Sequence, residues 1–166
     1  MKLREATAED AGLISSIIAQ SWRGTYQHFI DPIYLARLPE EYWLPSMRTW
    51  LSSGRMYGQI AEADERALGC IIYGRGREED HADWGEIVSL YLLPDAMGRG
   101  IGSELLTSAV YDLQADGYHR IYLWAIEENT RALRFYSRHG FVRTGERVNY
   151  RIGGGDVTDI RLALEG

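Results

Sequence analysis

Hydrophobic and polar positions change their period several times along the chain, and each change predicts an element. Short alternating or apolar runs predict strands at residues 2–6, 56–63, 66–74, 85–92, 119–126, 141–152 and 157–164. Apolar residues at helical spacing predict helices that begin near Thr7, Gly100 and Asn129. The aromatic segment 23–51 is interrupted by three prolines, which favours short helices and loops there.

The order of these elements predicts a mixed α/β (α+β) fold with helices on both faces of a sheet. Asp64-Glu65 is expected to turn a hairpin between two of the strands. No stretch resembles a linker or a repeat, so residues 1–166 are interpreted as one domain.

Three glycines mark the junction between the strand at 85–92 and the helix that follows it. Gly98, Gly100 and Gly102 stand one residue apart just before the apolar helical pattern. Glycines at a helix N-terminus let backbone N–H groups form a concave anion site. The alternative is a tight turn that only packs the helix on its strand. The spacing differs from the dinucleotide fingerprint and from the P-loop, which disfavours both.

Composition excludes several classes of protein. Asp plus Glu is 24 against 18 Lys plus Arg, for a net charge of −6, which argues against a nucleic-acid partner. The single cysteine, Cys70, lies in an apolar run, excludes a disulfide framework and a cysteine-based zinc site, and is expected to be buried; we expect no metal. No signal peptide or membrane span is recognisable, so a soluble cytoplasmic protein without a membrane partner is expected.

Two blocks together resemble the GNAT superfamily of N-acetyltransferases. Met97-Gly98-Arg99-Gly100-Ile101-Gly102, after a strand that ends LYLLP, is similar to the family's acyl-CoA motif, with Met97 where Gln or Arg is usual. The second block, residues 124–146, is similar to the segment in which an Asn precedes a helix that carries Tyr and ends at Gly-Phe. The resemblance implies a mixed, mostly antiparallel sheet of about seven strands. These strands splay between the fourth and fifth, and about four helices flank the sheet.

The resemblance also implies a site for acetyl-CoA. The pantetheine arm would pair with the backbone of the fourth strand, and the pyrophosphate would lie on the loop amides. Asn129 would bond the pantetheine region, with a simple N-cap as the alternative. The implied cofactor-binding residues are Leu90, Tyr91, Leu92, Gly98, Arg99, Gly100, Ile101, Gly102, Ser103, Asn129 and Tyr136.

The resemblance assigns catalytic roles to Tyr136 and Glu86. Tyr136 would protonate the departing thiolate, although a core aromatic is the alternative. Glu86 would be the base, on a face shared with Val88 and Leu90, although an exposed glutamate at a strand end is the alternative. Trp124 stands where other members carry a base. This leaves Glu86, or water alone, to remove the proton from the amine.

The implied reaction moves an acetyl group from acetyl-CoA to a primary amine of a small molecule or peptide by direct attack in a ternary complex. Segment 21–35 resembles the acceptor side of some members, so Trp22, Arg23, Tyr26 and His28 are candidate acceptor contacts. Five acidic residues before the fourth strand either surround the entrance and attract a cation or form a solvated loop: Glu78, Glu79, Asp80, Asp83 and Glu86. A homodimer is compatible with the family. The rival interpretations are an acyl-CoA-binding or sensing module without catalysis, and a structural domain whose glycines only make a turn.

Overall fold

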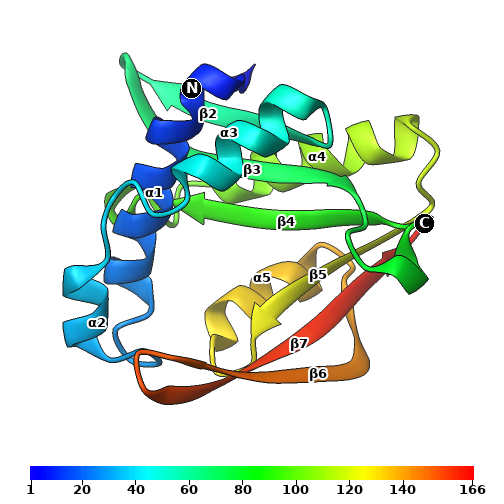
Figure 1. Cartoon of the computed structure of the whole chain (residues 1–166). Coiled ribbons are helices and arrows are strands. Elements are labelled where there is room, and N and C mark those ends of the chain that lie inside the picture. Colours follow the sequence, from blue (N-terminus) through cyan, green and yellow to red (C-terminus); the bar gives the residue numbers. More distant parts are fainter.

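A seven-stranded sheet runs through the molecule in the order β1-β2-β3-β4-β5-β7-β6 (Figure 1). The computed structural model describes residues 1–166. Only β4 and β5 run parallel, and every other neighbouring pair is antiparallel. The strands are β1 (Lys2–Glu5), β2 (Met56–Ala63), β3 (Arg66–Arg75), β4 (Gly85–Leu92), β5 (Arg120–Ile126), β6 (Val142–Ile152) and β7 (Gly155–Glu165).

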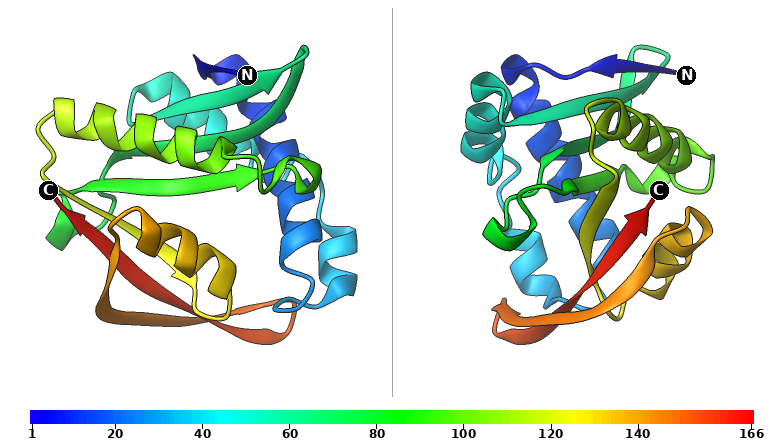
Figure 2. Two further views of the ribbon diagram at one scale, coloured as in Figure 1. Left: turned by 180° about the vertical axis from the view of Figure 1, so that it is seen from behind. Right: turned by 90° about the vertical axis from the view of Figure 1, so that its right-hand side faces the viewer.

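Helices cover both faces of the sheet, as Figures 1 and 2 show. We call the face covered by α1 (Ala11–Thr25) and α3 (Leu44–Ser53) the α1 face. The opposite face, covered by α4 (Ile101–Ala115) and α5 (Thr130–Arg138), is the α5 face. The short α2 (Pro32–Arg37) is a fifth helix where about four were expected. None of these helices is long and apolar enough to cross a membrane. The expected fold class is confirmed.

Local sequence explains why these elements form. Ile101, Leu105, Ala109 and Leu113 recur every four residues along α4, and all are at most 3% exposed. Asp64 and Glu65 both have positive φ, which a two-residue hairpin turn requires. The main core of 27 buried residues joins the sheet to α1, α3 and α4. A second cluster is separate from it and lies where α2 meets the tip of the β6–β7 hairpin: Ile30, Leu35, Ile126 and Val157.

The sheet opens between β4 and β5. These two strands pair only at Gly85 with Ile121 and at Glu86 with Tyr122, and they diverge from there (Figure 1). Beyond Glu86 the edge of β4 that faces β5 therefore has no strand partner. Since β5 stays paired with β7 along its whole length, the opening is a V between two intact halves of the sheet. The predicted splay is confirmed.

A β-bulge changes which side chains of β4 share a face. In the register with β3, Ile87 lies opposite Tyr73 and Ser89 lies opposite Ile72, so Val88 is an extra residue. Because one inserted residue reverses the alternation, Glu86 shares the α1 face with Ser89 and Tyr91. The expectation that Glu86 shares a face with Val88 and Leu90 is wrong for this reason.

Candidate active site

One cavity of about 450 Å³ passes through the V between β4 and β5. Helix α5 and the N-terminus of α4 contribute to its lining on the α5 face, and the end of α1 contributes on the other face. The lining includes no aspartate or glutamate. It includes nearly all of the predicted cofactor-binding residues: Leu90, Tyr91, Leu92, Gly98, Gly100, Gly102, Ser103, Asn129 and Tyr136.

The glycine loop forms one end of this cavity. Gly98 and Gly100 have φ of +77° and +80°, and Gly100 is the N-cap of α4. This left-handed backbone is strained for any residue with a Cβ. No atom lies within 4 Å of the place where a Cβ on Gly100 would stand, so the space beside the helix N-terminus is open. The loop thus fits a diphosphate. Arg99 is exposed, and Ile101 is 3% exposed, so Ile101 can offer only its backbone.

Three basic residues of α5 and its C-cap also line the cavity: Arg131, Arg138 and His139. Arg131 Nη2 lies 3.9 Å from the position of a Cβ on Gly98, so its guanidinium stands beside the loop. The sequence prediction missed all three. The seven-residue spacing of Arg131 and Arg138, which places both on one helix face, is the signal that could have found them.

The middle of the cavity is lined by β4 and α5. Leu90, Tyr91 and Leu92 belong to the part of β4 that has no partner on the β5 side. An extended ligand can therefore pair with this backbone as an added strand does. Asn129 lines the cavity and also caps α5, since its Oδ1 accepts a hydrogen bond from Ala132 N at 3.3 Å. Both predicted roles of Asn129 are thus sterically compatible.

Tyr136 extends from α5 into the cavity. Burial raises its pKa well above that of a free phenol, and the neighbouring Tyr91 phenol adds to the rise. Tyr136 is therefore protonated at neutral pH and has a proton to donate. Cys70, by contrast, is fully buried on β3, and burial raises the pKa of its thiol to about 12. No thiolate nucleophile is available from it at neutral pH.

Glu86 does not line the cavity. Its side chain is buried, and Arg77 donates to Oε1 from its backbone N–H and from Nε, both at 3.0 Å. Arg77 Nη2 donates to Oε2 at 2.7 Å, and the Tyr122 hydroxyl donates to Oε1 at 3.1 Å. With both oxygens occupied by Arg77 and Tyr122, Glu86 joins β4 to β5 at the vertex of the V. This geometry argues against its expected role as the base.

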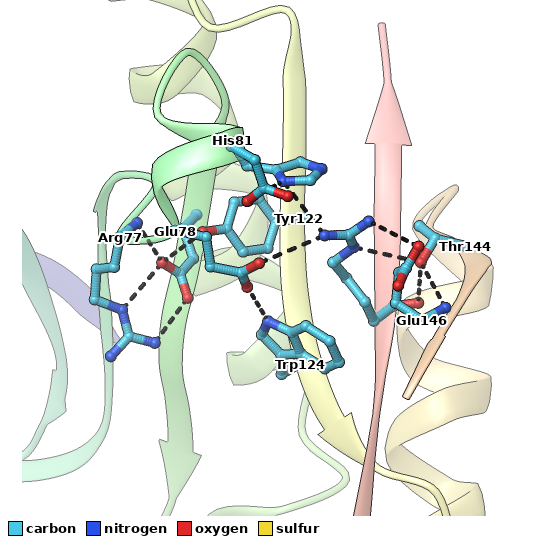
Figure 3. Close-up of polar contacts among 10 residues, drawn as sticks. Arg77, Glu78, His81, Tyr122, Trp124, Thr144 and Glu146 are labelled. Atoms are coloured by element: carbon cyan, nitrogen blue, oxygen red, sulfur yellow. Dashed lines mark hydrogen bonds and ion pairs between the residues drawn. The ribbon is translucent and has the colours of Figure 1, made fainter. Parts of the chain in front are cut away.

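On β5, Trp124 stands at the position where other family members carry a base, and it lines the cavity. Its Nε1 donates to Glu78 Oε1. Arg161 on β7 lies over the ring, with 5.7 Å from its guanidinium carbon to the ring centroid, and Arg161 Nη1 lies 3.5 Å from Glu78 Oε2. Figure 3 shows this network from Arg77 to Glu146. It fixes the plane of Trp124 as one wall of the cavity.

The acidic residues before β4 do not surround the cavity entrance. Glu78, Asp80 and His81 gather potential metal ligands within 4.8 Å of one another. Arg161 Nη1, however, is 3.5 Å from both Glu78 Oε2 and His81 Nδ1, so a cation already stands among these groups. The predicted cation-attracting ring is therefore not formed around the cavity.

Of the four candidate acceptor contacts, only Tyr26 lines the cavity. Trp22 packs behind it, with ring centroids 5.1 Å apart, and its buried Nε1 has no hydrogen-bond partner. Arg23 instead donates to the carbonyl oxygens of Leu35 and Leu38, where it closes the end of α2. His28 is exposed. The expectations for Arg23 and His28 are corrected accordingly.

Comparison with known proteins supplies independent evidence. Residues 22–141 match the model of the Acetyltransferase (GNAT) family. The uncharacterized N-acetyltransferase YuaI of Bacillus subtilis (strain 168) is 29% identical over 96% of this chain and 90% of its own length. The uncharacterized N-acetyltransferase Mb2688 of Mycobacterium bovis is 31% identical over 94% of this chain and 97% of its own.

A solved structure shares the fold. The PaiA N-acetyltransferase of Thermoplasma acidophilum, crystallised in complex with coenzyme A, superposes with a TM-score of 0.76 at 21% identity over 100% of both chains. The family resemblance drawn from the two sequence blocks is thus confirmed. The chain belongs to the acetyltransferase (GNAT) family, and it is an acyltransferase that takes its acetyl group from acetyl-CoA.

Proposed function

We propose that this protein transfers the acetyl group of acetyl-CoA to the primary amine of a small molecule or peptide, with both substrates bound at once. One observation carries the proposal: a single cavity joins the glycine loop on the α5 face to the α1 face. Two substrates can therefore enter from opposite faces and meet beside β4. Holding them there removes most of the entropic cost of their encounter.

The chain's own residues divide the work along the cavity. The loop amides, helped by Arg131, bind the diphosphate at the start of α4. The unpaired backbone of Leu90–Leu92 holds the pantetheine arm in an extended form, so the thioester lies beside β4. A free β4 amide near Leu92 is then positioned to stabilise the negative charge that develops on the carbonyl oxygen.

Tyr136 supplies the acid in this proposal. Its protonated phenol lines the cavity and can donate to the sulfur as the thiolate departs. The buried, neutral Cys70 offers no route through an acyl-enzyme, which favours direct attack by the amine.

A panel of amines tests the proposal. Acetyl-CoA is incubated with the protein and a polyamine, an arylalkylamine, an amino sugar or a peptide with a free α-amino group, and the released thiol is measured. Amine-dependent thiol release together with an acetylated product supports the proposal. A rise in melting temperature with coenzyme A but no turnover on any amine would instead support the acyl-CoA-binding module.

A further inference from the structure

A carboxylate that no sequence motif indicates lies just behind the cavity lining on the α1 face. Asp159 on β7 lies directly opposite Ile126, a residue of the cavity lining. Directly opposed residues on paired strands project from the same face of a sheet. Trp124 lies opposite Arg161, two residues along, so Asp159 belongs to the row that includes the Trp124 wall.

One phenol binds Asp159, and others line the neighbouring cavity. The Tyr150 hydroxyl donates to Asp159 Oδ1 at 3.0 Å. Burial raises the pKa of the Tyr91 phenol, and the negative charge of Asp159 raises it further. Tyr26 and Tyr91 both line the cavity, and Tyr26 and Tyr150 both pack against the second apolar cluster. Tyr91 and Tyr136 both line the cavity, so the phenol on which Asp159 acts belongs to the same lining as the proposed acid.

Asp159 differs from the other carboxylates near the V in having an oxygen without a partner. Tyr150 occupies Oδ1, and no group in the protein donates to Oδ2. Both oxygens of Glu86 are occupied, and Glu78 is held by Trp124 and Arg161. The charged neighbour of Asp159 along the same face, Arg161, is itself paired with Glu78 and Glu146. Asp159 is half-buried and raised in pKa by burial, as suits a proton acceptor.

We propose that Asp159 is the base of the transfer and that the acceptor is an amine that arrives as a cation. Tyr26, Tyr91 and Trp124 line the cavity, and Tyr150 binds Asp159, so the carboxylate stands beside aromatic side chains of the kind that bind an ammonium group. This inference rests on the proposed function, because a base is needed only if an amine attacks acetyl-CoA.

The step balances as follows. Asp159 Oδ2 takes one N–H proton from the ammonium ion, and the freed lone pair forms the C–N bond at the acetyl carbon. The C–S bond breaks, its electron pair leaves on sulfur, and Tyr136 protonates that sulfur. The second N–H proton restores Tyr136, and Asp159 passes its own proton to solvent. The products are the amide, coenzyme A and one proton.

The test compares Asp159→Asn with Asp156→Asn, a change at an exposed aspartate three residues earlier in β7. The acceptor is the best amine of the panel. We expect D159N to lower kcat/KM for the amine about 100-fold at pH 7, as removal of a general base does. Binding of acetyl-CoA should be unchanged. The rise of kcat/KM with pH, which in the parent follows ionisation of Asp159, should disappear in D159N. D156N should behave as the parent.

The free energy of unfolding distinguishes a loss of activity through the missing base from a loss through misfolding. Burial raises the Asp159 pKa, so the folded chain keeps this proton to higher pH than the unfolded chain does. Stability from this group is present below the unfolded pKa and is lost as pH rises through the folded pKa. D159N removes that penalty and should therefore be at least as stable as the parent at pH 7.

Two outcomes would overturn the assignment. One is a D159N enzyme with kcat/KM within threefold of the parent and an unchanged pH profile. The other is found in a binding measurement, which is used if no amine of the panel is acetylated. Failure of acetylation alone counts against the proposed function. In that case n-propylammonium is added to the coenzyme A complex while the Asp159 carboxyl is observed by ¹³C NMR. A shift of that resonance supports the acceptor site, and no shift rejects it.

Discussion

The two ends of the V between β4 and β5 are built from the same kinds of side chain but differ in how these are paired. At the vertex, Glu86 has both oxygens occupied by Arg77 and Tyr122. At the open end, Asp159 has one oxygen without a donor, and the Tyr136 hydroxyl faces the cavity. Both ends hold a carboxylate and phenols, and only the open end leaves them free to bind something else.

This contrast teaches that residue type alone does not identify a base. A carboxylate whose lone pairs are all used stabilises the strands that it joins, and a substrate proton cannot reach it without breaking those bonds. A carboxylate with a spare oxygen beside a cavity can accept a proton. Substitution of Glu86 tests the closed end and substitution of Tyr136 tests the open end, and smaller effects are expected at the cofactor loop and at Arg131.

Glu86→Gln should have the largest effect, and it should fall on stability. Glu86 is buried, and its replacement weakens three charge-assisted hydrogen bonds from Arg77; because Arg77 is 43% exposed and water compensates it in part, the free energy of unfolding should fall by about 3 kcal/mol. Denaturant unfolding measures this. At 15 °C, where the protein stays folded, kcat should remain within about twofold of the parent. The exposed Glu79 provides the control Glu79→Gln. A large loss of kcat with stability unchanged would restore Glu86 as the base.

Tyr136→Phe should affect catalysis rather than stability. Loss of the acid should lower kcat about 100-fold while acetyl-CoA still raises the melting temperature as in the parent. Tyr111 is 72% exposed on α4, so Tyr111→Phe is the matched control and should leave kcat unchanged. Full activity in Y136F would mean that Tyr136 only packs against its neighbours and is not the acid.

Gly100→Ala tests the loop. A Cβ at φ +80° strains the backbone by about 1–2 kcal/mol and turns amides away from the diphosphate, so the Kd for coenzyme A should rise about tenfold. Gly54 ends α3 at φ +72° with open space around it, away from the cavity. Gly54→Ala should therefore cost similar stability and leave the Kd unchanged. Calorimetric titration measures the Kd, and equal effects of the two changes would contradict the loop's role.

Arg131→Gln should have the smallest effect. A single guanidinium beside the glycine loop contributes a partly screened attraction, so the Kd for coenzyme A should rise about threefold at low salt and less at high salt. Arg134, exposed on the same helix and outside the cavity lining, provides the control Arg134→Gln. If both variants bind coenzyme A equally, Arg131 makes no specific contact with the phosphates.

The sequence predicts the fold, and most of the proposed cofactor contacts lie in the cavity lining, because these features depend on local patterns. The stripe of α4, the hairpin at Asp64-Glu65 and the glycine loop each lie within a few consecutive residues. Asn129 and Tyr136 follow from their place in one helix. In such segments the spacing of residues fixes their geometry before any tertiary contact forms.

The acceptor half could not be predicted in the same way, because it is made by long-range contacts. The bulge at Val88 is invisible in the sequence, yet it decides which face Glu86 occupies. Arg77 satisfies Glu86 from a different strand end, and Asp159 comes to lie beside the cavity lining only through the pairing of β7 with β5. A pattern read along one segment contains no information about such partners.

The separate apolar cluster of Ile30, Leu35, Ile126 and Val157 has an evolutionary consequence. It anchors the segment around α2 to the β6–β7 tip without drawing on the 27-residue main core. Exposed positions between residues 27 and 38 can therefore change while the anchoring cluster and the donor machinery stay intact. Relatives built this way can diverge in what they modify and still share one way of holding the acetyl group.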